Sequence, residues 1–287
     1  MFEALFQYQF LRNALFSGIL ASIVCGVVGV IVIEKKLVMM SGGIAHTSYG
    51  GVGLGYLLGF EPIVGAFLFS ILAAVGVGYI KRKGGARSDV IVGLFWSLGM
   101  ALGILFIGLM PGYPPDLSSY LFGNILSVTN ADLIRAGSLT FIVILTIIAF
   151  FNDWKAYLFD EEFASIIGVK TALLEYVLLI LIAMTIVALI RVVGIILVLA
   201  LLTAPAAAAG LLTSDLKKRM AASVLLGMVY CVAGLWASYA LDIASGASIV
   251  IISAACYFLL FAVRTVTERI KNKKRRARSA ASGEAQV

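Results

Sequence analysis

The sequence predicts an all-α fold: a polytopic membrane protein with about nine transmembrane helices joined by short loops. The 287 residues are 62% hydrophobic and 13% charged, whereas soluble domains are about 45 to 50% apolar and about 25% charged. The mean hydropathy is +1.06. A helix needs about 20 apolar residues to cross a bilayer, so these helices would use nearly the whole chain. We therefore expect a single transmembrane domain over residues 1–270 and no separate soluble catalytic domain.

Apolar runs between charged and turn residues give the expected spans in chain order. The runs are 14–33, 41–59, 62–80, 90–110, 131–151, 172–190, 193–212, 221–241 and 248–266. Two of them are weak, because 41–59 is rich in glycine and 193–212 contains Pro205. Either could be broken or re-entrant where protein or a water-filled cavity covers the loose backbone groups. The expected number is therefore nine, with eight as the alternative.

The distribution of lysine and arginine predicts the orientation in the membrane. On the nine-span map, 19 of the 22 basic residues fall on one side and 3 on the other, namely Arg12, Arg135 and Arg191. By the positive-inside rule the richer side is cytoplasmic, which places the C-terminus inside and the N-terminus outside the cell membrane. Residues 271–287 are expected to form a disordered basic cytoplasmic tail. The net charge of +7 then reflects orientation in a lipid membrane, and we expect no nucleic-acid partner.

Small residues recur every fourth position in several expected spans. Gly51 and Gly55 belong to one such stripe in the second span. Helices approach closely along stripes of this type, and Pro205 adds a second feature that could shape or gate a helix. The alternatives are packing inside one chain, a dimer interface, or a sliding contact during transport.

Several classes of chemistry are excluded by what the sequence lacks. The pattern GxxxxGK[ST] does not occur, so any ATP must be hydrolysed by another protein. The three cysteines lie in apolar runs and never form a CxxC pair, which argues against disulfides and zinc knuckles. No acidic residue lies deep in an expected span, so a proton relay through buried carboxylates is not expected.

His46, the only histidine, lies about five residues into the second expected span. Gly42 and Gly50, one turn before and after it, are expected to leave open space on its helix face. The imidazole either bonds to serine or backbone groups or contacts a substrate. One imidazole cannot form a tight zinc site by itself, so hydroxyl groups, carbonyls and water would have to complete it. The nearby hydroxyl groups belong to Ser41, Thr47 and Ser48.

The segment DEEFASIIG, residues 160–168, predicts a short helix on the cytoplasmic side. Asp160 can act as the N-cap, and Glu161 and Glu162 favour the positive end of the helix dipole. Gly168 can close the helix in the left-handed conformation.

This short helix has an apolar face without a membrane to enter. Phe163, Ile166 and Ile167 lie at i, i+3 and i+4, and Ala164 is expected on the same docking surface. The face either packs on the transmembrane bundle of the same chain or binds a partner protein, as exposed apolar patches commonly do.

Five strings in this order resemble the permease subunits of zinc and manganese ABC importers, the ABC-3 family. The strings are SGGIAHTSYGGVGLGYLLG, SDVIVGLFWSLGMALGILF, SSYLFGNIL, FDEEFASIIGV and VVGIILVLALLTAPAAAAGLL. The resemblance covers nearly the whole chain from Phe10 to about Val263. It implies a permease homodimer, two cytoplasmic ABC ATPase subunits, and an extracytoplasmic metal-binding protein that delivers the ion.

The resemblance also assigns roles to residues. It implies that residues 160–168 form the coupling helix on the ATPase and that His46 faces the path of the metal. Gly42 departs from the family pattern, in which an aspartate usually stands four residues before the histidine, so one ligand remains where the family has two. Imidazole suits zinc, and the lost carboxylate is a ligand that manganese prefers, so we expect zinc over manganese. The chain itself is expected to hold no cofactor and to be no enzyme.

Three other classes remain as alternatives. An ion-coupled secondary transporter would need buried carboxylates or an inverted repeat, and neither is evident. A channel would need no ATPase partner. An intramembrane enzyme would need an acid or nucleophile beside His46, and the sequence places none there.

Overall fold

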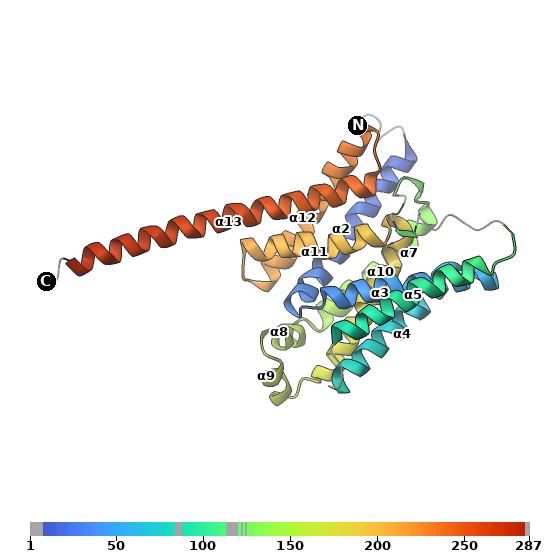
Figure 1. Cartoon of the computed structure of the whole chain (residues 1–287), viewed down its shortest axis with the longest axis horizontal. Helices are drawn as coiled ribbons and strands as arrows, with labels where there is room; N and C mark the ends of the chain where they lie inside the picture. The colour runs from blue at the N-terminus through green and yellow to red at the C-terminus, as the bar shows by residue number, and fades with distance from the viewer. Residues whose placement is uncertain (1–7, 84–87, 113–119, 122, 124, 285–287) are drawn as a thin grey trace.

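The computed structural model of the chain describes residues 8–83, 88–112, 120–121, 123 and 125–284, and within these ranges it contains helices and no β-strand (Figure 1). The predicted all-α class is confirmed for this part of the chain. The elements are α2 Gln9–Glu34, α3 Val38–Leu58, α4 Pro62–Lys83, α5 Ser88–Gly108, η1 Ile125–Ser127, α7 Asn130–Ala149, α8 Phe151–Phe159, α9 Glu161–Ile166, α10 Thr171–Val193, α11 Ile195–Leu212, α12 Leu216–Leu241 and α13 Ser245–Glu284.

Seven segments of the described residues are long and apolar enough to cross a membrane, so the expected number of nine is not confirmed. One segment, Thr171–Leu212, contains both α10 and α11, which meet at Gly194 with a φ of +79°. α3 is not among the seven, because its many glycine, serine and threonine residues dilute its apolar ones. Both doubtful segments nevertheless form unbroken helices, and Pro205 lies buried inside α11 without interrupting it.

The helices pack as two groups joined by α10. In the first group α3 packs on both α4 and α5. In the second, α2 packs on α11 and α12, and α13 covers both of these (Figure 1). α10 contacts α4 and α7 as well as α2 and α11. Its buried side chains, such as Leu178, Ile182 and Ile186, therefore belong to a core shared by both groups.

Glycines allow the closest approaches within each group. A Cβ atom at Gly51 would overlap the backbone of Gly65, and one at Gly55 would lie 2.7 Å from Cα of Pro62, so α3 and α4 meet backbone to backbone. On α2, a Cβ at Gly26 would lie 2.8 Å from Cα of Val224 in α12. These small residues therefore face helices of the same chain, where a side chain could not fit.

α13 is much longer than a membrane requires and projects away from the other helices (Figure 1). α13 continues to Glu284. The segment from residue 271, which was expected to be disordered, is therefore helical as far as Glu284. Alanine, lysine and arginine are strong helix formers, which accounts for the continuation. Nearer the bundle, Arg264 donates a 2.7 Å hydrogen bond to the carbonyl of Leu211 in the last turn of α11, where helix carbonyls lack partners.

Candidate functional site

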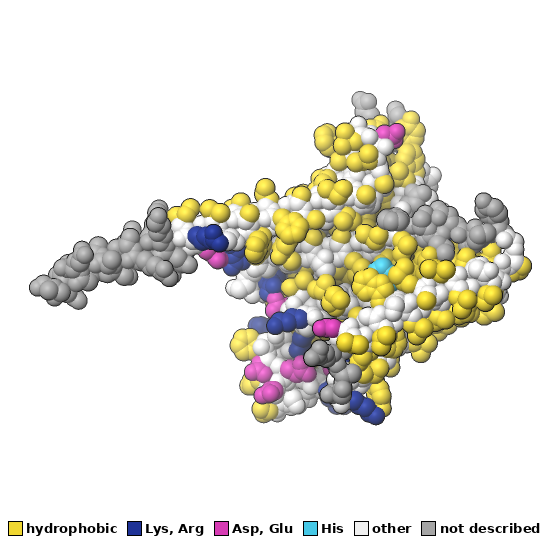
Figure 2. Space-filling view, in the orientation of Figure 1, with side chains coloured by type: hydrophobic (Ala, Val, Ile, Leu, Met, Phe, Trp, Pro, Cys, Tyr) yellow, Lys and Arg dark blue, Asp and Glu magenta, His cyan; other side chains and the backbone are white. Residues whose placement is uncertain are grey.

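His46 lies in the middle of α3 on an open face of the chain. Figure 2 shows its side chain as a single spot among apolar side chains, and the residue is half-buried. Its ring stacks on Trp96 of α5, with ring centroids 4.1 Å apart and planes 8° apart. Nδ1 is buried without a hydrogen-bond partner, so of the two alternatives for His46, bonding to serine or backbone groups is not seen at this nitrogen.

The space expected beside His46 is filled by neighbouring helices. A Cβ atom at Gly42 would lie 3.3 Å from Cζ3 of Trp96, and one at Gly50 would lie 2.8 Å from the carbonyl oxygen of Gly99. The expectation of open space is therefore wrong at Gly50, and at Gly42 the ring of Trp96 takes up part of the space, because α5 packs on this face of α3. A cavity of about 250 Å³ remains beside Gly42 and Trp96, between α3, α5 and α11.

The hydroxyl groups near His46 are directed to backbone carbonyls. Ser41 donates to Val38 at 2.7 Å, Ser48 to Ala45 at 2.5 Å, and Thr47 to Gly43 at 2.7 Å and to Phe95 at 2.9 Å. Within the described residues, no three His, Cys, Asp or Glu side chains gather closely enough to hold a metal ion. The site in one chain therefore offers a single imidazole.

The short cytoplasmic helix forms as the sequence predicts. Asp160 is the N-cap of α9, and its carboxylate accepts hydrogen bonds from the backbone N–H of Glu162 at 2.9 Å and of Phe163 at 3.1 Å. Gly168 follows the helix with a φ of +90°, in the region that favours glycine.

The two sides of α9 differ sharply in exposure. Ala164 is fully buried against the bundle, whereas Ile166 is 83% exposed and Phe163 and Ile167 are also exposed. Phe159, just before the N-cap, extends the same apolar surface. Ala164 thus anchors α9, and the expectation that it lies on the docking surface is wrong. We call Phe159, Phe163, Ile166 and Ile167 the α9 surface.

The end of α2 holds α8 and α9 in place. Nζ of Lys35 lies 3.0 Å from Oε2 of Glu161 and 3.4 Å from the ring centroid of Tyr157. Trp154 and Tyr157 of α8 are buried beneath. Burial raises the pKa of the Tyr157 phenol, so the ring stays neutral and suits a cation on its face. Glu34, the neighbour of Lys35, pairs with Arg219 of α12.

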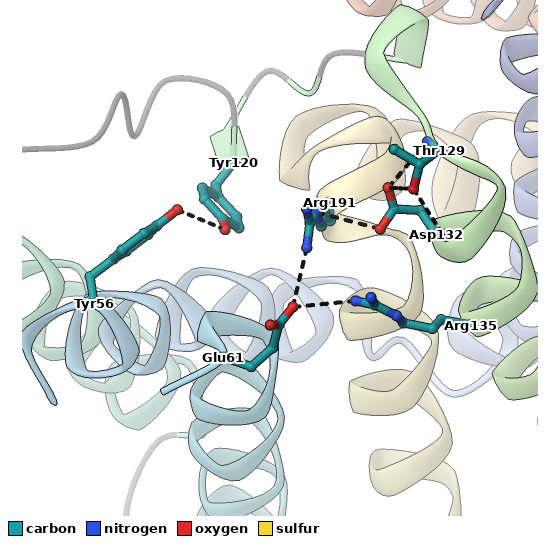
Figure 3. A network of polar contacts seen from close by, with 7 residues as sticks. All are labelled: Tyr56, Glu61, Tyr120, Thr129, Asp132, Arg135 and Arg191. Atoms are coloured by element: carbon teal, nitrogen blue, oxygen red, sulfur yellow. Dashed lines mark hydrogen bonds and ion pairs between the residues drawn. The ribbon is translucent and has the colours of Figure 1, made fainter. Parts of the chain in front are cut away.

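A polar network connects the ends of three helices far from α9 (Figure 3). Nη1 of Arg191 lies 3.2 Å from Oε1 of Glu61, and Nη1 of Arg135 lies 3.3 Å from the same oxygen. Nε of Arg191 lies 3.5 Å from Oδ1 of Asp132. Asp132 also accepts a 2.6 Å hydrogen bond from the hydroxyl of Thr129, the N-cap of α7. Two arginines and two carboxylates thus hold α4, α7 and α10 together.

A cavity of about 410 Å³ opens beside this network. Tyr56 and Tyr120 form part of its wall, with their hydroxyl oxygens 3.2 Å apart (Figure 3). Burial, followed by the hydrogen bond with Tyr56, raises the pKa of Tyr120. In the sequence, Arg135 and Arg191 contribute only to the count of basic residues on each side of the membrane, and this polar network is not predicted from it. Arg191 stands alone between two apolar runs, and such a residue needs a carboxylate partner, which was the available signal.

The chain is similar to known membrane transport proteins. Residues 7–264 match the family model described as ABC 3 transport family. The manganese transport system membrane protein MntC of Halalkalibacterium halodurans is 34% identical over 260 residues, which cover 91% of this chain and 89% of that protein. A probable iron transport system membrane protein of Haemophilus influenzae is 32% identical over 263 residues, which cover 92% and 97%.

A solved structure agrees with these sequence matches. PsaBC from Streptococcus pneumoniae, in complex with Fab, superposes with a TM-score of 0.82 and 34% identity, over 91% of this chain and 94% of that one. The names of the matched relatives refer to manganese and iron, so the expected preference for zinc is not supported. The chain is the membrane component of an ABC transport system, and its ATPase is a separate protein. With a family match that covers most of its length, the chain belongs to the ABC 3 transport family.

Proposed function

We propose that this chain is the permease subunit of an ATP-driven importer of divalent transition metal ions, and that manganese is its preferred substrate. The family match and the manganese names of similar proteins support this assignment. Mn²⁺ prefers oxygen ligands. Because His46 is a single nitrogen donor, water molecules would supply most of the oxygen ligands as the ion passes.

The path is completed by a second copy of the chain. His46 lies on an open, mostly apolar face (Figure 2), and a polar ring that faces lipid is costly and marks a candidate functional site. A homodimer that buries this face would place two imidazoles on one path. Such a site binds weakly enough for an ion to leave again, as transport requires.

The α9 surface is the docking site for the cytoplasmic ABC ATPase. It lies at the end of the molecule where basic and acidic side chains gather (Figure 2), and its apolar side chains are exposed although the helix itself is anchored by Ala164. An exposed apolar patch held on a rigid support is suited to a partner protein.

The two ends of the helix bundle face different compartments. Lys81 and Arg82 at one end of α4 pair with Glu175 at the start of α10, whereas Glu61 at the other end of α4 pairs with Arg191 at the end of α10. We place the first end, with the C-terminus, in the cytoplasm by the positive-inside rule. Nine helices then cross the cell membrane, and the end with the 410 Å³ cavity receives the ion from an extracytoplasmic metal-binding protein.

Uptake measurements test this function. The chain, its ATPase and its binding protein are expressed in cells that lack their own manganese importers, and uptake of Mn²⁺, Fe²⁺ and Zn²⁺ is measured. We expect ATP-dependent uptake of Mn²⁺ that falls strongly in His46→Asn at equal amounts of folded protein. The matched control is Ser97→Ala, which removes an exposed hydroxyl of α5 bonded only to its own helix. Normal uptake in His46→Asn would remove His46 from the path.

A further inference from the structure

The indole of Trp96 fixes the plane of the His46 ring. The two rings are parallel within 8° at a centroid distance of 4.1 Å, although they belong to different helices, α5 and α3. An imidazole that makes no hydrogen bond through Nδ1 would otherwise turn about its side-chain torsions. The stacked indole therefore replaces the hydrogen bond that usually orients a histidine.

The same indole also covers the position one helical turn before His46. An ideal Cβ atom at Gly42 would lie 3.3 Å from Cζ3 of Trp96 and 3.9 Å from two further atoms of the ring. A methyl group at position 42 would press on the edge of the indole, which would have to shift by a few tenths of an ångström. A second ligand at position 42 would therefore compete with Trp96 for the same space.

A cavity adjoins the indole on the side of Gly42. It measures about 250 Å³ and is lined by Trp96 and Gly42 together with Met39 of α3 and Thr203 of α11. The hydroxyl of Thr203 donates to the carbonyl of Leu199 within its own helix, and most of the remaining wall is apolar. The cavity offers the indole room to move but adds no charged ligand.

We infer that Trp96 is a positioning residue for His46, and that Gly42, which carries no ligand, leaves the space that the indole needs, so that each chain offers a single imidazole ligand. This inference rests on the proposed function. The substrate is then a divalent ion that keeps most of its water shell. When the metal binds, positive charge spreads onto the imidazole, and the electron-rich face of the indole stabilises it as in a cation–π contact.

The first test compares Trp96→Leu with Trp96→Phe in the assembled transporter. Mn²⁺ uptake into proteoliposomes is measured against concentration. Leucine keeps an apolar side chain but removes the stack, so the concentration for half-maximal uptake should rise roughly 2- to 10-fold, the range measured for aromatic pairs. Phenylalanine keeps a flat ring and should recover most of this loss. A half-maximal concentration that does not change in Trp96→Leu, or a loss confined to the maximal rate in both variants, would overturn the positioning role.

The second test asks whether positions 42 and 96 act together. Gly42→Ala should raise the half-maximal concentration, because its methyl group pushes on the indole. Adding Trp96→Phe makes room, so the double variant should perform better than Gly42→Ala alone. Strictly additive effects of the two substitutions would contradict the pairing.

A binding measurement separates this inference from the function on which it rests. Mn²⁺ is paramagnetic and quenches the fluorescence of nearby indoles. We expect saturable quenching that is largely lost in Trp96→Phe, although Trp154 and Trp236 remain, and that is also lost in His46→Asn. If His46→Asn abolishes uptake while Trp96→Leu and the quenching experiment show no effect, only the role of Trp96 fails. If His46→Asn is harmless, the proposed path itself fails.

Discussion

Glu175, near the start of α10, is 5% exposed, which is unusual for a carboxylate in a helix of membrane length. Lys81 donates to it at 2.6 Å, and Nη1 of Arg82 lies 3.5 Å from its second oxygen. Both cations stand in the last turn of α4, where they also favour the helix dipole. A buried charge needs such partners, so this contact fixes how α4 and α10 end together.

Glu175→Ala should therefore destabilise the folded chain. Loss of the carboxylate leaves two cations close together without a partner, and we expect the free energy of unfolding to fall by about 1–3 kcal/mol. The thermal unfolding midpoint of the detergent-solubilised protein measures this. The control is Glu268→Ala, whose ion pair with Arg264 is exposed and should contribute little. Equal shifts in both variants would show that the burial of Glu175 is unimportant.

At the scale of single elements, α9 illustrates the difference between an anchor and a docking surface. Ala164 is fully buried and Ile166 is 83% exposed, only two positions apart. Helical geometry puts residues two apart on nearly opposite sides. The same helix can therefore be held by its own chain and still present an apolar surface to another protein.

Ile166→Asp should abolish ATPase binding without unfolding the permease. The new charge lies in the α9 surface and would have to be desolvated on docking. Co-purification of the ATPase with the tagged permease is measured, and the permease peak in size exclusion reports folding. The control is Lys155→Asp. Lys155 is an exposed residue of α8 outside the α9 surface, so this variant should still bind the ATPase. Normal co-purification in Ile166→Asp would place the ATPase elsewhere.

Lys35 should transmit the position of α9 to the transmembrane helices. Lys35→Glu places two like charges together at Glu161, and we expect Mn²⁺ uptake to fall while the ATPase still binds. The double variant with Glu161→Lys restores opposite charges and should recover part of the uptake. Because Glu161 is 47% exposed although Lys35 is only 16% exposed, the ion pair should contribute about 1 kcal/mol, and the unfolding midpoint should fall only slightly. An uptake defect that the second substitution does not relieve would argue against this contact.

For the whole molecule, the two charged ends define an orientation. Contacts such as Lys35–Glu161 and Arg264 with the carbonyl of Leu211 gather the basic helix ends at one end. The network around Arg191 closes the opposite end (Figure 3). A helix bundle with a basic end and, opposite it, an end closed by the Arg191 network can bind an ATPase on one side of the membrane and receive an ion on the other.

Single cysteines test this orientation in intact cells. In a background without the three native cysteines, Ala244→Cys between α12 and α13 should react with an impermeant thiol reagent. Lys218→Cys at the start of α12 should react only after the cells are opened. Both residues are exposed, so a lack of labelling reports the side of the membrane. The opposite labelling pattern would invert the proposed topology.

The sequence by itself predicted the long apolar helices and the short helix α9, but not α8. Lipid and a protein core both require continuous apolar runs, so the runs appear in the sequence whatever their neighbours are. The N-cap Asp160 and Gly168 act within a few residues, and this local chemistry is also readable without the fold. Pro205 makes a break in segment 193–212 possible, yet α11 continues through this residue, which is buried.

Only the tertiary structure decided what each helix face meets. Helical periodicity shows that Gly42 and His46 share a face, but not that Trp96, 50 residues after His46 in the chain, covers both. The contact between Arg191 and Glu61 joins residues 130 positions apart, and Ala164 is buried because α9 packs on α8 and α10. Periodicity orders residues around one axis, whereas contacts depend on how several axes pack, and no local pattern contains that information.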